Sequence, residues 1–253
     1  EVEWVDTHLG RSLEALEKAG ELDNTLIVVT SDHGMPFPRV KGQIYEHGFH
    51  VPLLVRWGSQ IQGGRSVDDF INVRDFAPTF MEAAGLKPAA TMTGKSFIDV
   101  LKSGKSGVVD ASRDTMIVAK ERHDLGRPND AGYPVRAIRT REWLYVRNYE
   151  PDRCPAGNPE TGYRNVDDSP SKTLLISKFD DYYKMSFGKR PAEEFYHVSE
   201  DPDCVKNLAQ NREHALIMRQ LRDKMEETLR REYPQYMEVV APRRLDAARR
   251  EEQ

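Results

Sequence analysis

A group of charged residues follows a strongly apolar run near the start of the chain. The run is TLIVVT at residues 25–30, and Asp32 and His33 follow it as neighbours. A carboxylate and an imidazole side by side can serve as two ligands of a divalent cation. Lys41 comes next, and its ammonium group suits an anionic oxygen. The pattern indicates half of a metal site with an anion-binding amine close by.

A structural role for these residues is the alternative. Asp32 could cap a helix, and His33 could form a hydrogen bond within the core. Gly34 permits a sharp turn after the apolar run, and Pro36 and Pro38 stiffen the loop that follows. The spacing alone leaves both interpretations open.

The elements that must position these residues are two apolar strands. Residues 25–30 show no polar alternation, which is typical of a strand buried on both faces of a parallel sheet. Val51–Trp57 is a second such run, with Pro52 at its start. Ligands bind at the carboxyl ends of strands in open α/β sheets, which is where Asp32 and His33 would lie.

The remaining chain changes character along its length. Helical spacing predicts helices over Val5–Ala19 and Val73–Ala84, and a charged helix over Ala215–Tyr233 with Leu216, Leu221, Met225 and Leu229 inward. Short β-rich runs separated by turns predict an antiparallel meander of four strands. Those runs are Thr115–Ala119, Val135–Thr140, Trp143–Asn148 and Glu194–Val198.

The segment Lys102–Arg113 is rich in Gly, Ser and Lys and is typical of a surface linker. We therefore expect two parts, an α/β domain over residues 1–105 and an α+β subdomain over residues 106–253. A net charge of −4 and the absence of a basic stripe argue against nucleic-acid binding. No apolar run is long enough for a membrane span.

The segment from residue 24 to 57 resembles the C-terminal half of the formylglycine-dependent sulfatases, members of the alkaline phosphatase-like superfamily. In that family a strand ends in S-D-N-G or S-D-H-G, and a Lys precedes the pattern Y-E-x-G-x-x-V-P-L-x-V-x-W. This chain has those residues in that order from Ser31 to Trp57. Residues 191–209, PAEEFYHVSEDPDCVKNLA, are similar to the family's closing segment.

The resemblance covers essentially the whole chain and implies its fold and site. The fold would be the C-terminal part of an alkaline phosphatase-like sandwich: a mixed, mostly parallel sheet with helices on both faces, followed by a small α+β subdomain with an antiparallel sheet and a C-terminal helix. Asp32 and His33 would bind the family's calcium ion, and Lys41 would contact the sulfate and act in catalysis. His33 stands where many members have Asn, an oxygen ligand that calcium prefers.

The loop MPFP at residues 35–38 resembles the sulfamidase (heparan N-sulfatase) branch. The implied function is hydrolysis of a sulfuric ester or sulfamate on a sulfated carbohydrate, such as the glycosaminoglycan heparan sulfate. His123, in a long polar loop, is a candidate substrate contact. The family's habit implies export to the periplasm, lysosome or exterior, although no signal segment is present in this chain.

The nucleophile of this family is a formylglycine made from Cys in the motif C-x-P/S-x-R. Neither Cys154 nor Cys204 has Arg four residues later, and the Asp pairs of the chain do not match the family's early metal motif. We therefore expect the chain to be a fragment that is inactive alone. Its partners would be a sulfated saccharide and the missing N-terminal half of the same protein. A disulfide between the two Cys and two separate thiols stay equally open.

Several polar residues near the motif have simpler structural interpretations. Glu46 is expected to fix the loop by hydrogen bonds, and His47 and His50 to have solvent-facing or structural roles. Arg136 and Arg139 are interpreted as the wet face of a strand.

Two rival functions remain at this point. A two-zinc phosphodiesterase or nucleotide pyrophosphatase of the same superfamily also carries SDHG, and His47-Gly48 could form its next metal motif. A non-catalytic sulfatase-like domain that only binds a sulfated glycan is the other. The pattern from Lys41 to Trp57 fits sulfatases better than the first rival, and intact Asp32, His33 and Lys41 argue against the second.

Overall fold

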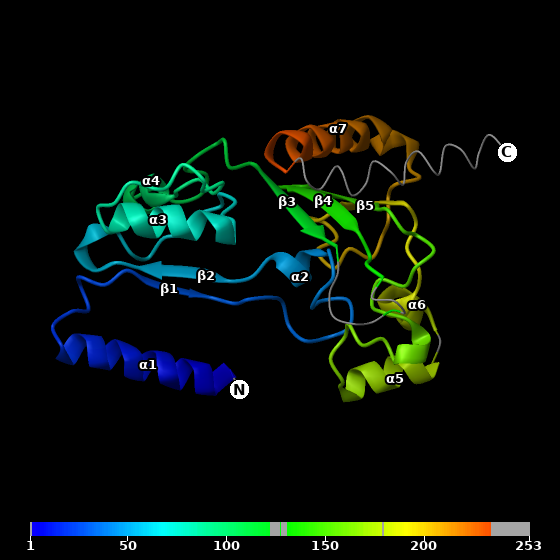
Figure 1. The fold of residues 1–253 in the computed structure, drawn as a ribbon, viewed down its shortest axis with the longest axis horizontal. Coiled ribbons are helices and arrows are strands. Elements are labelled where there is room, and N and C mark those ends of the chain that lie inside the picture. The colour runs from blue at the N-terminus through cyan, green and yellow to red at the C-terminus, as the bar shows by residue number, and fades with distance from the viewer. Residues whose placement is uncertain (1, 122–126, 128–130, 179, 234–253) are drawn as a thin grey trace. The chain divides into compact units, whose positions relative to one another are not determined.

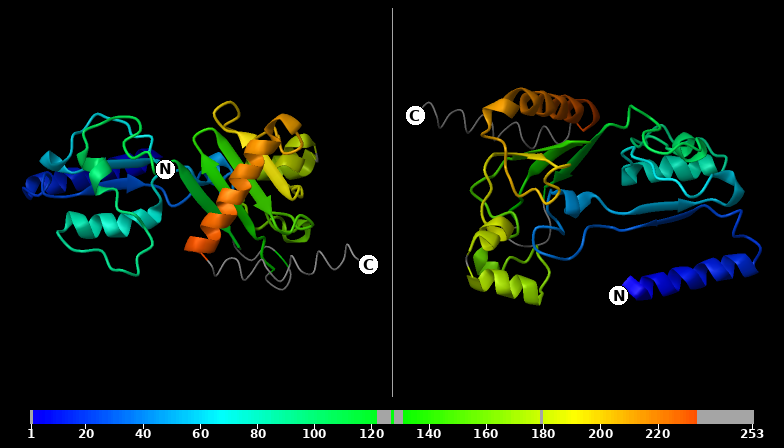
Figure 2. Two further views of the ribbon diagram at one scale, coloured as in Figure 1. Left: turned by 90° about the horizontal axis from the view of Figure 1, so that it is seen from above. Right: turned by 180° about the vertical axis from the view of Figure 1, so that it is seen from behind.

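The computed structural model describes residues 2–121, 127, 131–178 and 180–233. These residues form two compact units, which are described separately. The first unit comprises residues 1–31 and 52–114, and the second comprises residues 32–51 and 115–253. Both units are drawn as ribbons in Figure 1 and Figure 2. The predicted domain boundary between residues 105 and 106 stays a prediction. The two compact units described here change between residues 114 and 115.

The first unit contains short helices and a two-stranded sheet. Its elements are α1 (Val2–Lys18), β1 (Ile27–Thr30), β2 (Leu53–Arg56), η1 (Gly58–Gln60), η2 (Val73–Asp75), α3 (Phe76–Ala83) and α4 (Ile98–Lys102). The predicted helix near the N-terminus is confirmed as α1, and the predicted helix over Val73–Ala84 appears as η2 followed by α3. Helix α1 buries none of its residues in this unit, and Val5 of its apolar face is exposed.

The two apolar strands pair with each other in antiparallel register, Ile27 with Arg56 and Thr30 with Leu53. Each run was expected to be a strand buried on both faces, and within this unit neither strand is buried in that way. The connection over residues 31–52 contains no helix that crosses back over the sheet, and strands joined without such a crossover run in opposite directions. Both strands stay partly exposed, and Leu54 is 61% exposed.

The core of the first unit forms around Phe97, Val100 and Leu101, against which Phe76 and Val67 pack. The segment predicted as a surface linker belongs to this core. Arg113 is buried and pairs with the buried Asp75 at 2.9 Å. The composition of this Gly- and Ser-rich segment could not predict the buried ion pair of Arg113, because a single residue hardly changes the composition of a segment.

The second unit is built on a four-stranded antiparallel meander, as predicted. Its strands are β3 (Thr115–Lys120), β4 (Val135–Thr140), β5 (Trp143–Asn148) and β6 (Glu193–His197), in that spatial order. Its helices are α2 (Glu46–Phe49), α5 (Pro170–Lys178), α6 (Asp181–Phe187) and α7 (Ala215–Glu232), with η4 (Pro159–Thr161) and η5 (Arg212–His214). The sequence did not predict the four short helices α2, α4, α5 and α6.

Helix α7 covers one face of this sheet (Figure 1). Its Leu221, Met225 and Leu229 are buried against Ile138 and Tyr145, as expected, whereas Leu216 is exposed and was wrongly assigned to the inner face. The opposite face packs against the segment that carries the predicted site. Ile44 and Tyr45 lie there against strand residues that include Val135, Ala137, Leu144, Val146 and Tyr196.

Candidate functional site

The segment of residues 32–51 is folded tightly upon itself before it packs on the sheet. The amide of Gly34 donates to the carbonyl of Gly48 at 3.3 Å. A Cβ atom on Gly34 would lie 2.0 Å from the carbonyl oxygen of His47, and one on Gly48 would lie 2.4 Å from that of Gln43. Glycine is therefore required at both positions, because any side chain would push the two arms of the segment apart.

Asp32 and His33 are close together at the start of this segment. The distance between Asp32 Oδ2 and His33 Nε2 is 3.5 Å, and the Asp32 side chain is 84% exposed. The other ring nitrogen of His33 lies 2.6 Å from the carbonyl oxygen of Gly34. This contact turns Nε2 towards the Asp32 carboxylate. The two donor atoms are thus arranged as neighbouring ligands of one cation would be.

This donor pair fits a divalent cation as half of a site. Among the residues that the structure describes, no group of three or more His, Cys, Asp or Glu side chains is arranged to hold a metal ion. One carboxylate and one imidazole are too few ligands for calcium, which takes six to eight oxygen ligands. The remaining ligands would have to be other oxygen atoms, from further carboxylates, carbonyl groups or water.

Lys41 lies on the same segment and is paired with Asp167. Its Nζ is 2.7 Å from Asp167 Oδ2, and the Lys41 side chain is mostly buried while Asp167 is half exposed. The structure thus brings Asp32 and His33 together, whereas Lys41 forms an ion pair with Asp167, which is distant in sequence. The sequence gives no signal for this pairing, because Lys41 and Asp167 are 126 positions apart.

Glu46 anchors the segment to the sheet, as expected of it. Its carboxylate accepts from Arg139 Nε at 2.6 Å and from Arg139 Nη2 at 3.0 Å. His50 Nδ1 lies 2.7 Å from the same carboxylate. Burial alone raises the pKa of Glu46, but the hydrogen bonds from His50 and Arg139 outweigh it and lower the pKa to about 2. Glu46 therefore stays ionised at neutral pH and is not suited to act as a proton donor.

Arg136 and Arg139 were interpreted as a wet strand face, and this is wrong, since both are buried. Residues three apart in a strand point to opposite faces, so the two arginines never shared one. Both faces of β4 are covered. Arg139 forms an ion pair with Glu46, and Arg136 forms one with Glu121.

A buried carboxylate on β6, that of Glu194, holds the segment at Tyr45. Glu194 Oε2 accepts from the hydroxyls of Tyr45 at 2.9 Å and Tyr196 at 2.6 Å, and Asn148 donates to Oε1 at 2.8 Å. Burial and the charge of Glu194 raise the pKa of Tyr45, so its hydroxyl remains protonated and donating. Arg39 lies over the Tyr45 ring with its guanidinium carbon 3.9 Å from the ring centre.

The remaining candidates lie away from these contacts or outside the described residues. His47 Nε2 is 2.9 Å from Asp203 Oδ1, and both side chains are at least half exposed. His123 lies outside the described residues. Cys154 and Cys204 are both free thiols, which resolves the open question of a disulfide between them.

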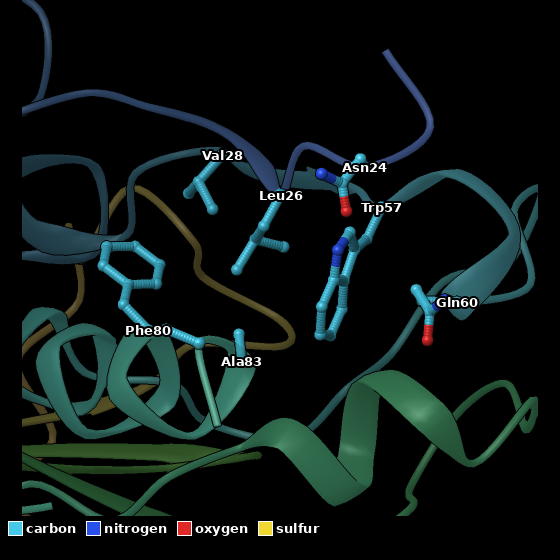
Figure 3. Close-up of a pocket in the computed structure, with 8 residues that line it drawn as sticks. Asn24, Leu26, Val28, Trp57, Gln60, Phe80 and Ala83 are labelled. Atoms are coloured by element: carbon cyan, nitrogen blue, oxygen red, sulfur yellow. The ribbon is translucent and has the colours of Figure 1, made fainter. Parts of the chain in front are cut away.

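The first unit contains a cavity of about 650 Å³ between the strands and α3 (Figure 3). Figure 3 shows Leu26, Val28 and Phe80 on one side and Trp57 beside Gln60 on the other. The lining has no ionisable side chain: Asn24, Leu26, Val28, Trp57, Gln60, Phe80, Ala83 and Ala84. This cavity therefore offers no side chain that could act as an acid or a base. No helix in the described residues combines the length and apolarity that crossing a membrane requires.

Comparison of the sequence with known proteins gives matches to sulfatases. The sulfatase family model matches residues 1–86. An ulvan-active sulfatase of Formosa agariphila is 28% identical over 89% of this chain, and N-sulphoglucosamine sulphohydrolase of Homo sapiens is 25% identical over 87% of it. The chain spans 36% of the first relative's length and 44% of the second's.

A solved structure agrees with these sequence matches. A protein in complex with its substrate D-glucosamine-2-N,6-O-disulfate is 26% identical to this chain and superposes with a TM-score of 0.66. The match covers 94% of this chain and 40% of that protein. The expected mixed α/β fold with an antiparallel sheet and a C-terminal helix is thereby confirmed. By sequence and by fold, the chain is related to the sulfatases of the alkaline phosphatase-like superfamily, as its motifs implied.

Proposed function

We propose that the protein is a sulfatase that hydrolyses a sulfate group from a sulfated carbohydrate. The proposal is supported by the arrangement of three side chains on the segment of residues 32–51. Two potential cation ligands stand 3.5 Å apart at its start, and an ammonium group projects from its middle. A sulfate ester needs positive charge around its oxygens as the bond to the leaving group breaks, and this segment supplies it.

Asp32 and His33 are proposed to hold one divalent cation, with calcium as the first choice. The bound ion would supply positive charge to the sulfate oxygens. His33 would contribute through Nε2, since its other nitrogen faces the carbonyl of Gly34. The nitrogen ligand is unusual for calcium, which prefers oxygen, so the identity of the metal is part of the test.

Lys41 is proposed to contact the sulfate and stabilise charge on its oxygens or on the leaving oxygen. An ammonium group has three N–H donors. The carboxylate of Asp167 accepts one of them at 2.7 Å, which leaves two for a bound anion. Asp167 would thereby orient the amine of Lys41 while occupying only one of its three N–H donors.

The nucleophile is proposed to come from sequence outside this chain. Neither Cys lies in the motif C-x-P/S-x-R, and burial raises the pKa of Cys204 to about 11, which suppresses its thiolate. The relatives are more than twice as long as the part that this chain matches. A formylglycine on that further sequence would complete the site.

A sulfated glucosamine is the proposed substrate class. The human relative is named for N-sulphoglucosamine, and the solved structure contains a glucosamine with N- and 6-O-sulfate groups. The relative from Formosa agariphila is named for activity on ulvan, so polysaccharides other than heparan sulfate belong in the test.

The test is a substrate panel with the natural full-length protein that contains this chain. The panel comprises an aryl sulfate, glucosamine N-sulfate, glucosamine 6-sulfate, a sulfated ulvan oligosaccharide and an aryl phosphodiester. Calcium and zinc are each supplied to metal-free protein. We expect sulfate release with calcium. Preferential cleavage of the phosphodiester with zinc would favour the phosphodiesterase, and glycan binding without hydrolysis would favour the non-catalytic domain.

A further inference from the structure

One enclosed amine of the second unit takes no part in the chemistry proposed above. Lys120 is the last residue of β3. Its Nζ donates a hydrogen bond to the carbonyl oxygen of Gly42 at 2.6 Å. Gly42 directly follows Lys41 and has a φ of +68°, a conformation that favours glycine. Lys120 therefore holds the turn at the residue next to the proposed sulfate-binding amine.

The turn of residues 39–45 is tied to other parts of the unit at its start, at its middle and at its end, in addition to the pairing of Lys41 with Asp167. At its start, Arg39 donates to the carbonyls of Met185, at 3.0 Å, and Cys204. At its end, Tyr45 donates to Glu194 at 2.9 Å. Lys120 reaches the middle of the turn, where the backbone direction determines where the side chain of Lys41 points.

A cavity beside Lys120 is too small for a substrate group. Its volume is about 10 Å³, and Gln43, Tyr133 and Asn148 are among the residues that line it. Such a volume has room for about one water molecule. Lys120 therefore supports the turn from behind and does not bind the sugar or its sulfate.

The electrostatic setting of Lys120 also indicates a dedicated role. No carboxylate within ion-pair distance of Lys120 is found among the described residues, and the charged oxygens of nearby Glu194 already accept from Tyr45, Tyr196 and Asn148. Burial, together with the charges of Arg127 and Arg190, lowers the pKa of Lys120 to about 7. A protonated amine with no acidic partner among the described residues is unfavourable, and its hydrogen bond to Gly42 offsets part of the cost, together with the Tyr133 ring, whose centre is 5.6 Å from Nζ.

We propose that Lys120 is a positioning residue that directs Lys41 towards the bound sulfate by holding the carbonyl of Gly42. The inference rests on the proposed function of Lys41. Lys120→Met removes the donor and keeps most of the side-chain volume. Lys184→Met is the matched control, because Lys184 is an exposed lysine of the same unit, paired with Asp181.

The first measurement is hydrogen–deuterium exchange on the natural full-length protein. Lys120→Met should accelerate exchange about 10-fold in peptides that cover residues 39–45, which is the effect expected from the loss of one hydrogen bond. Peptides of β4 and β5 should exchange as in the wild type. Unchanged exchange in residues 39–45 overturns the proposal, and so does equal acceleration across the whole sheet, which would mean a general stabilising role.

The second measurement is the inhibition constant of inorganic sulfate, which does not depend on the fraction of active enzyme. We expect it to rise about 10-fold in Lys120→Met and to stay unchanged in Lys184→Met. An unchanged constant in Lys120→Met overturns the positioning role. A wild-type protein that hydrolyses no sulfate ester would defeat the proposed function, while the exchange experiment would still decide whether Lys120 holds the turn.

Discussion

The carboxylate of Glu46 and the guanidinium of Arg139 form a two-point ion pair, with hydrogen bonds of 2.6 and 3.0 Å. Both side chains are only about 10% exposed. The pair joins the segment that carries Asp32, His33 and Lys41 to strand β4. Planar pairing of this kind fixes orientation as well as distance, so it determines how the segment sits on the sheet.

Glu46→Gln should destabilise the second unit by about 3 kcal/mol. The substitution leaves the buried guanidinium of Arg139 without its counter-charge, and breaking such a pair from one side costs roughly 3–5 kcal/mol. Denaturant unfolding of the natural full-length protein measures the change. Glu227→Gln, at an exposed position of α7, is the control and should change the stability by less than about 0.5 kcal/mol. Equal effects of the two variants would contradict the role assigned to the pair.

The contact between His50 and Glu46 should make stability depend on pH in two ranges. The hydrogen bond to Glu46 raises the pKa of His50 above its ordinary 6.5, against the effect of burial. Its contribution is complete below pH 6.5 and disappears as the pH rises through the higher folded-state value. The pKa of Glu46 is lowered to about 2 from 4.5, so its contribution is present above pH 4.5 and is lost as the pH falls towards 2.

The check is the free energy of unfolding of wild type and His50→Ala between pH 5 and 9. The difference between the two proteins should be largest at the acidic end and should shrink above neutrality. The effect will be modest, because the His50 side chain is 71% exposed and water screens the pair. A difference that grows with rising pH would contradict the assigned contact.

Asp32→Asn and His33→Ala should each reduce metal binding in the natural full-length protein by at least about 10-fold. Asp32→Asn removes the negative charge of one proposed ligand, and His33→Ala removes the other ligand altogether. Equilibrium dialysis against calcium measures the dissociation constant. Asp203→Asn is the matched control, since Asp203 belongs to the other exposed His–Asp pair of the unit and should leave affinity unchanged. Unchanged calcium affinity in both site variants would remove Asp32 and His33 from the metal site.

Lys41→Met should lower kcat for sulfate ester hydrolysis by about 10²-fold, the usual effect of removing one donor to a developing oxyanion. Asp167→Asn should have a smaller effect, about 10-fold, because it loosens the orientation of the amine but keeps its charge. Steady-state kinetics measure both, with Lys184→Met as the control. An Asp167→Asn variant faster than the wild type would show that Asp167 restrains Lys41 and does not orient it.

The sequence predicted the local elements of this chain well. Short β-rich runs separated by turns predicted the meander of β3 to β6, and helical spacing predicted α1 and α7, because these signals are local. The pairing of β1 with β2 was not predictable in the same way. An unbroken apolar run indicates burial, but it carries no information about which strand lies beside it or in which direction.

The site shows the same division between local and distant information. Asp32 and His33 are neighbours in sequence, and their proximity in space follows directly. The partners Arg139 of Glu46, Asp167 of Lys41 and Lys120 of Gly42 are distant in sequence, and only folding brings them together. The strand period does place Arg136 and Arg139 on opposite faces, so the burial of one of them could have been anticipated.

The most direct test of the central claim is a crystal structure of the natural full-length protein with calcium and inorganic sulfate bound. We expect Asp32 Oδ2 and His33 Nε2 to bind the same cation and Lys41 Nζ to lie about 3 Å from a sulfate oxygen. A cation bound without Asp32 and His33, or a sulfate that Lys41 does not reach, would contradict this claim.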